Sequence, residues 1–168
     1  MANTDISKYA TNERLGKMDV DVITLTPDTA TEETLAGDVI FQAEELPNMV
    51  SVNAGTCMVH SIGVLDDDDN GQAIDLVFMD TTGLLDAGDD GGIIDAADGV
   101  IPDAILGVVQ ITSYFDGIAW QYGYKTNIGL VLKAPSSSKS IYVSAVNRGS
   151  TSTWTAAGLR LQIGVIKD

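Results

Sequence analysis

The sequence predicts an all-β protein, an antiparallel β-sandwich or jelly roll of roughly ten short strands. Short apolar segments rich in Val, Ile, Thr, Tyr, Phe and Trp recur along the 168 residues, as pleated strands favour. Turn-forming Gly, Asp, Asn, Pro and Ser residues separate these segments at regular intervals. No periodic stretch is long enough for the crossover helices that a parallel sheet needs, so an antiparallel arrangement is predicted.

The strand candidates follow one another through the chain. They are residues 18–26, 38–42, 49–52, 56–65, 73–79, 105–112, 118–124, 127–133, 140–147 and 159–166. Alternation of apolar and polar residues is clearest in the last one, where one face carries Leu159, Leu161, Ile163 and Val165. We expect that face to be buried, together with a set of residues from two other candidates: Ile128, Leu130, Leu132, Ile141 and Val143.

Two segments have weak helical character. Residues 29–36 (TATEETLA) predict one or two helical turns, with Thr29 or Thr31 as the cap and glutamates near the N-terminus. Residues 95–104 predict another short turn, which Gly99 and Pro102 interrupt. Neither is long enough to organise the fold.

The predicted domain organisation is a polar N-terminal arm, residues 1–17, followed by a single β-sandwich domain, residues 18–168. The arm is either a disordered leader or a segment that orders against a neighbouring subunit, with Tyr9 and Leu15 as anchors. It has no signal-peptide pattern. No apolar run approaches the roughly 18 residues of a membrane span, so no membrane association is expected.

Charge is distributed very unevenly. No Lys or Arg lies between Met18 and Tyr124, whereas 21 of the 24 acidic residues do, and the formal net charge of the chain is −15. The charge of this acidic block must be solvated, held by cations, or matched by the basic C-terminal quarter or by another subunit. Binding to nucleic acid depends on Lys and Arg at phosphates, so a nucleic-acid partner is not expected.

The run Asp66-Asp67-Asp68-Asp69-Asn70-Gly71 is the sharpest local motif. Asp66, Asp68 and Asn70 alternate before a glycine, as in the first half of a calcium-binding loop, and they are the candidate metal ligands for Ca²⁺. The second half fails, because Val77 stands where a closing Glu is needed. The favoured interpretation is a solvated hairpin tip, with Asn-Gly as the turn and with weak or absent cation binding.

No catalytic set of residues is recognisable, so an enzyme is not expected and a hydrolase is the least favoured class. His60 is the only histidine and lies within a predicted strand, as a core or subunit-contact residue. Cys57 is the only cysteine and is predicted to be a small buried hydrophobe. Walker A, dinucleotide-binding and zinc-ligand spacings are all lacking in the sequence, and no cofactor is expected other than the possible Ca²⁺.

Trp120, Tyr122 and Tyr124 alternate along one predicted strand. This spacing suits either an aromatic platform for a sugar or the inner, buried face of a strand. The buried face is the favoured interpretation.

Several strand-like motifs in the second half of the chain resemble small proteins that coat or decorate the heads of tailed, especially marine, bacteriophages. The matching stretches are LVFMD (76–80), ILGVV (105–109), TNIGLVLK (126–133), SIYVSAVNRG (140–149) and LRLQIGVIKD (159–168). The resemblance implies a β-rich virion protein that assembles as a symmetric oligomer, and it implies no functional residue.

The leading hypothesis is therefore a non-enzymatic capsid decoration or cement protein. It would be synthesised in the host cytoplasm, bind the major capsid protein at the capsid surface of the virion, and form a homo-oligomer, with a trimer favoured. The alternative is a fibre, spike or carbohydrate-binding β-sandwich module. Its site would comprise Trp120, Tyr122, Trp154 and the acidic loops at residues 66–71 and 86–92.

Overall fold

The computed structural model describes residues 19–81 and 104–168, and it confirms the all-β fold class. The strands are β1 (Asp19–Leu25), β2 (Glu33–Thr34), β3 (Val39–Leu46), β4 (Thr56–Asp66), β5 (Ile74–Met79), β6 (Ile105–Ile111), β7 (Tyr114–Asp116), β8 (Gln121–Lys133), β9 (Ile141–Asn147), β10 (Ser152–Thr153) and β11 (Leu159–Lys167).

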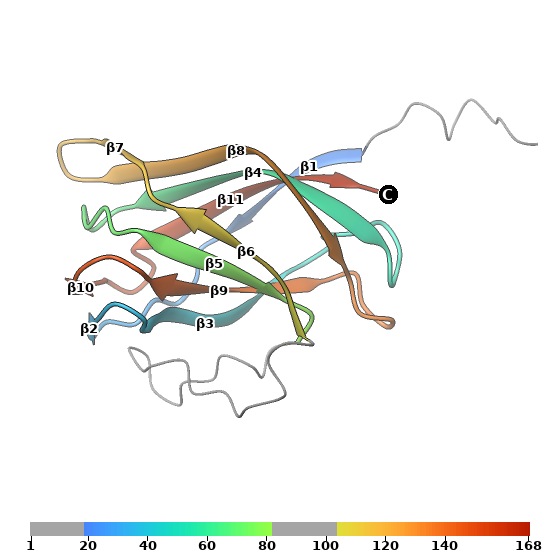
Figure 1. Ribbon diagram of the computed structural model, residues 1–168, viewed down its shortest axis with the longest axis horizontal. Coiled ribbons are helices and arrows are strands. Elements are labelled where there is room, and N and C mark those ends of the chain that lie inside the picture. The colour runs from blue at the N-terminus through green and yellow to red at the C-terminus, as the bar shows by residue number, and fades with distance from the viewer. Residues whose placement is uncertain (1–18, 82–103) are drawn as a thin grey trace, which may run out of the picture.

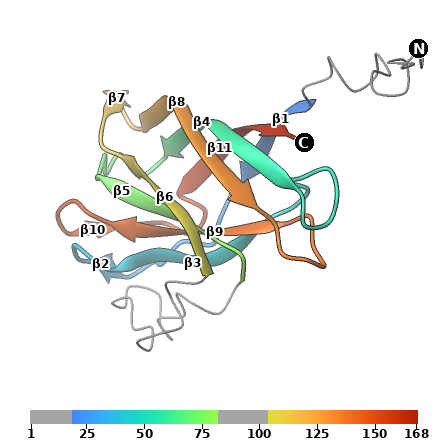
Figure 2. The same cartoon turned by 45° about the vertical axis from the view of Figure 1, so that its right-hand side comes forward.

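Two sheets pack face to face as a sandwich (Figures 1 and 2). One has five strands in the order β1-β11-β4-β8-β7, and the other has four in the order β3-β9-β5-β6. Every pairing in them is antiparallel. The short pair β2–β10 forms a third, two-stranded sheet at one end. The chain crosses between the two large sheets several times, for example from β4 to β5 and from β6 to β7.

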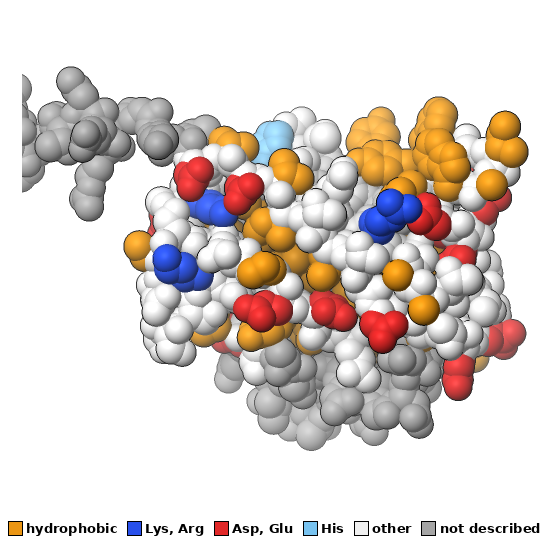
Figure 3. Space-filling model, turned by 180° about the vertical axis from the view of Figure 1, so that it is seen from behind, with side chains coloured by type: hydrophobic (Ala, Val, Ile, Leu, Met, Phe, Trp, Pro, Cys, Tyr) orange, Lys and Arg blue, Asp and Glu red, His pale blue; other side chains and the backbone are white. Residues whose placement is uncertain are grey.

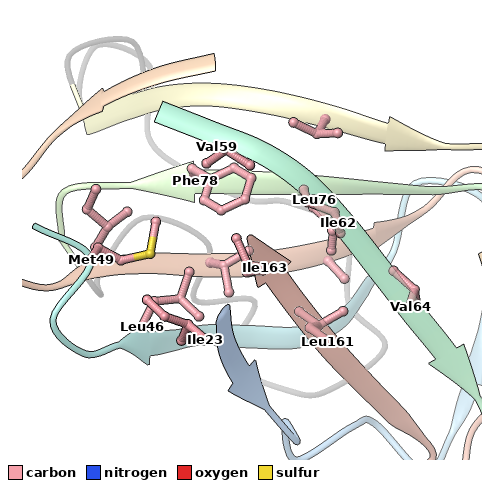
Figure 4. Packing of buried hydrophobic residues seen from close by; sticks show 14 of the residues in the cluster. Ile23, Leu46, Met49, Val59, Ile62, Val64, Leu76, Phe78, Leu161 and Ile163 are labelled. Carbon is pink, nitrogen blue, oxygen red and sulfur yellow. The ribbon is translucent and has the colours of Figure 1, made fainter. Parts of the chain in front are cut away.

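The core lies between the two large sheets (Figure 4). Leu159, Leu161, Ile163 and Val165 are all fully buried there, as the alternation of β11 predicts. Of the other predicted core residues, Leu132, Ile141 and Val143 are buried, whereas Ile128 and Leu130 pack against the core while partly exposed. Cys57 is buried in the same core, which confirms its predicted role.

Three predicted elements differ from the structure. Residues 49–52 form no strand, although Met49 and Val50 are buried. Residues 29–36 contain β2 instead of a helical turn, because the Thr34 side chain bonds to Ser152 across the small sheet. The buried Thr29, predicted as a cap, donates its hydroxyl to the carbonyl of Thr155. The arm at residues 1–17 and most of the predicted turn at 95–104 lie outside the described residues.

The candidates 118–124 and 127–133 are wrong as separate strands, because they contribute to one continuous strand, β8. Val59 pairs with Leu130 and Ser61 with Thr126, so β8 has extra residues at this point. Asn127 and Gly129 take positive φ angles of 55° and 68° there. These turn-forming residues therefore make a bulge within a strand, where the sequence pattern suggested a connection.

Part of the acidic block pairs with the chain's own C-terminal quarter. Each ion pair among the described residues joins an Asp of residues 18–124 to a cation of residues 125–168: Asp75 with Arg148, Asp67 with Arg160, and Asp21 with Lys167. The prediction that these two parts of the chain make contact is confirmed. The pairs are partly exposed, so each contributes modestly to stability.

Candidate functional site: the outer face of the five-stranded sheet

The face of the five-stranded sheet that points away from the core carries an ordered array of side chains. Strand register aligns them in three rows that cross the sheet. The rows are Val22, Gly164, Ser61 and Thr126; then Thr24, Gln162, Gly63 and Tyr124; then Arg160, Leu65, Tyr122 and Phe115. Alternate residues of the same strands, such as Ile23, Ile62 and Ile163, point into the core.

Two hollows on this face share lining residues, and a third of about 420 Å³, lined by residues 113–115 and Tyr124, lies beside them. The larger of the two that share residues has a volume of about 310 Å³ and lies over β1, β11, β4 and β8, with Val22, Ser61, Gly63, Thr126 and Gly164 among its lining residues. The smaller, about 160 Å³, lies beside Thr24, Leu65 and Arg160. Tyr122 and Gln162 line both, so the two hollows form one groove with the Tyr122 ring between them. We call this the outer groove.

Two glycines lie beneath the outer groove, and neighbouring side chains lie close over them. A Cβ atom on Gly63 would lie 2.1 Å from the Tyr122 hydroxyl oxygen, so the tyrosine side chain extends across β4 over that glycine. A Cβ atom on Gly164 would lie 2.4 Å from Ser61 Oγ. The Tyr122 and Tyr124 rings are stacked, with centroids 6.4 Å apart and planes 19° from parallel. Tyr124 is 61 % exposed, so the pair presents aromatic surface to solvent.

The connection from β7 to β8 projects apolar side chains into solvent. Phe115 and Trp120 are 62 % and 40 % exposed, and Ile118 between them is fully exposed. The Phe115 and Trp120 rings pack against each other, with centroids 5.9 Å apart. Figure 3 shows hydrophobic side chains gathered at this end of the molecule. We call Phe115, Ile118 and Trp120 the apolar hairpin tip.

The aromatic residues therefore lie differently from the sequence prediction. Trp120, Tyr122 and Tyr124 were expected on a buried face, and all three instead lie toward solvent. The inward residue between the two tyrosines is Gly123, whose buried position the Ile111 and Tyr114 side chains approach. Trp154, a predicted sugar contact, is 1 % exposed, and its Nε1 donates to Thr34 Oγ1. It cannot contact a ligand at the surface.

The side chain of each predicted cation ligand is hydrogen-bonded to other groups of the protein, and each has a different set of partners. Asp66 accepts hydrogen bonds from the backbone amides of Asp68 (3.0 Å) and Gly71 (2.7 Å). Asp68 accepts from the amide and hydroxyl of Thr155, at 2.8 and 2.7 Å. Asn70 donates its side-chain amide to the Thr153 carbonyl (3.0 Å). The three side chains brace the loop and the neighbouring residues 153–155.

The prediction that the segment 66–71 is a hairpin tip is also wrong, because β4 and β5 belong to different sheets. It is a crossover between the two layers. Asp66 lies fully buried at its start, and burial raises the pKa of this carboxyl group. The amides of Gly71 and Asp68 oppose the rise in pKa, and the nearby Asp68 charge adds to it.

The other singled-out residues give no reactive centre. His60 is exposed, at the point where the register of β4 against β11 shifts. Of its two predicted roles the core position is therefore wrong, and the subunit contact stays a prediction. Burial raises the pKa of the Cys57 thiol to about 11, with the Asp168 charge adding to the effect, so the thiol is protonated at neutral pH. Within residues 19–81 and 104–168, no group of three or more His, Cys, Asp or Glu side chains is arranged to hold a metal ion.

The same part of the chain contains no helix with the length and apolar character needed to cross a membrane. Comparison with known proteins adds no assignment, since no family model, curated protein or solved structure matches this chain.

Proposed function

We propose that this protein is a non-enzymatic virion structural protein that decorates or cements the capsid of a tailed bacteriophage. The apolar hairpin tip carries the proposal. Phe115, Ile118 and Trp120 expose adjoining apolar surface on a chain with a net charge of −15. Contiguous exposed apolar surface marks an interaction site, and contact with another protein is one of its common uses. The expected partner is the major capsid protein.

The charge distribution supports the same role. Arg148, Arg160 and Lys167 each pair with an aspartate of their own chain, so they do not add free positive charge to the surface. A surface of one dominant sign keeps many copies apart in solution before they assemble. Assembly then depends on the apolar surface, and a closed homo-oligomer, with a trimer favoured, is the expected form.

Electron microscopy of intact particles labelled with an antibody to this protein tests the proposal. Label spread across the shell is the expected result. Label confined to a tail fibre or spike would favour the alternative function instead, a fibre, spike or carbohydrate-binding module. The solvent-facing pair of Tyr122 and Tyr124 is the observation that supports this alternative. Absence of label from the particles would reject both.

A binding experiment tests the hairpin tip itself. Ile118→Ser should weaken rebinding of the purified protein to particles from which it has been stripped. Val131→Ser is the matched control, since Val131 is also an exposed apolar residue of this sheet but lies outside the hairpin tip. Light scattering of the purified protein tests the proposed homo-oligomer. A molar mass equal to that of the monomer at all concentrations would contradict this part of the proposal.

A further inference from the structure

We propose that the outer groove binds an extended, uncharged glycan of β-1,4-linked, glucose-type sugars, with Tyr122 and Tyr124 as stacking residues and Gln162, Ser61 and Thr126 as hydrogen-bonding residues. This site is additional to the proposed virion role and does not require it. The outer groove shares no residue with the hairpin tip, although Tyr124 and Phe115 line a common hollow where the two surfaces meet. Ile118 lines none of these hollows, so Ile118→Ser tests the hairpin tip separately from the outer groove.

The shape of the outer groove suits a chain and not a compact ligand. Its two hollows meet at Tyr122 and Gln162, and the lining residues come from four neighbouring strands. The larger hollow alone reaches the lower end of the roughly 300–1,000 Å³ range of small-molecule sites. Gly63 and Gly164 leave room for the Tyr122 and Ser61 side chains to lie close to the middle of the sheet, which keeps the outer groove shallow.

The chemistry of the outer groove suits a neutral ligand. Ser61, Thr126, Gln162 and the tyrosines offer hydroxyl and amide groups and aromatic surface, but no charge. Arg160 at one end is the charged lining residue of the two hollows, and it is already paired with Asp67. An anionic polymer would also meet the repulsion of a chain with net charge −15.

Glucose-type sugars match these groups. Their equatorial hydroxyls leave flat C–H faces that stack on aromatic rings, while the hydroxyls at the ring edge bond to amide and hydroxyl side chains. A β-1,4 linkage keeps successive rings in a flat ribbon, which fits a shallow track across a sheet.

An extended peptide fits this surface less well. Within a sheet the strand amides and carbonyls pair with one another, so a peptide lying on the face would find only side chains for its own backbone groups. Peptides normally add at a sheet edge. At the nearby edge strand β1, the amide of Val22 is already bonded to the Asp21 side chain (2.8 Å).

Isothermal titration of the intact protein with β-1,4-linked hexamers of glucose and of N-acetylglucosamine tests the inference. We expect at least one hexamer to bind at concentrations up to about 5 mM, which would fill roughly four-fifths of a site with a Kd of about 1 mM. Tyr124→Ala should weaken that binding by about tenfold or more. Val131→Ala, at a similarly exposed apolar position of β8, should leave it unchanged.

A second variant separates the groove from the aromatic pair. Gly164→Ala places a methyl group against Ser61 Oγ, a side chain that can rotate away, so the protein should fold and keep its melting temperature while the floor is raised. Weaker glycan binding by this variant supports the site. Absence of binding to both hexamers, or binding that neither variant alters, would overturn the inference. Binding of a synthetic peptide of residues 1–17, with neither hexamer bound, would assign the groove to the N-terminal segment of another copy, and would also overturn the inference.

Discussion

The indole Nε1 of Trp154 donates a hydrogen bond of 3.2 Å to the Thr34 hydroxyl, between residues 120 positions apart in the sequence. Thr34 belongs to β2 and Trp154 follows β10, so the bond holds the small two-stranded sheet against the core. The Thr34 hydroxyl also lies 3.0 Å from Ser152 Oγ, and the Asn147 amide donates to the Thr34 carbonyl. This end of the sandwich therefore combines a buried aromatic side chain with a fully bonded polar cluster.

Replacing Trp154 tests that arrangement. Trp154→Ala should lower the free energy of unfolding by about 3–5 kcal/mol, because it removes a large side chain that is almost completely buried. Urea denaturation followed by circular dichroism measures the change. Trp120→Ala is the control, since this second tryptophan lies in the exposed hairpin tip, and we expect a loss below about 1 kcal/mol. Equal losses in both variants would contradict the assignment of Trp154 to the core.

Leu161→Ala tests the core between the large sheets. Leu161 is fully buried on β11, and its truncation should cost about 2–5 kcal/mol in the free energy of unfolding. Val131→Ala, at an exposed position of β8, should change that free energy by less than about 0.5 kcal/mol. A loss below about 0.5 kcal/mol for Leu161→Ala would mean that the face of β11 is inverted.

Local patterns were enough to predict most strands. In β11, polar and small residues alternate with Leu159, Leu161, Ile163 and Val165, so the buried face follows from period-2 geometry alone. The bulge in β8 was missed because Asn127 and Gly129 are typical of turns, and only the pairing with β4 shows that the strand continues through them. The separation of β4 and β5 into different sheets likewise depends on distant partners.

The candidate binding surface was harder to predict. Tyr122 and Tyr124 alternate with Gln121, Gly123 and Lys125, a pattern that suggests a buried aromatic face. The side chains of Ile111 and Tyr114 approach the inner surface at Gly123, and the tyrosines point outward. That arrangement depends on how β6 and β7 pack against β8, which the alternation within β8 alone does not show. The sequence contains many glycines, but its pattern does not indicate that Gly63 and Gly164 are the two that lie beneath the outer groove.

Lys167→Met tests charge pairing between the acidic block and the C-terminus. The Lys167 ammonium group donates to Asp21 (2.8 Å), and this hydrogen bond, with that from the Val22 amide, lowers the pKa of the Asp21 carboxyl group. A lowered pKa stabilises the fold above the ordinary value of about 3.9, and that contribution is lost as the pH falls through the lowered pKa. In the variant, NMR titration should show the pKa of Asp21 moving up toward its ordinary value. An unchanged pKa would mean that the pair does not form in solution.

Asp66→Asn tests the buried carboxyl group at the crossover. Burial favours the neutral acid and the amide donors of Asp68 and Gly71 favour the carboxylate, and the raised pKa means that burial has the larger effect. A raised pKa in the folded state stabilises the fold most below the ordinary value of about 3.9, and this stabilisation is lost as the pH rises through the raised pKa.

The asparagine variant cannot ionise at this position, so the comparison isolates the carboxyl group. Near pH 3 both side chains are neutral, and we expect similar free energies of unfolding, within about 1 kcal/mol. As the pH rises above about 3.9, the native protein should lose stability relative to the variant, and the difference should level off above the raised pKa. Urea denaturation at a series of pH values measures it, with Asp69→Asn as the control for removing one charge at an exposed position of the same loop. A native protein that instead gains stability relative to Asp66→Asn over this range would mean that the amide donors outweigh burial, and that the crossover is held by an ionised carboxylate.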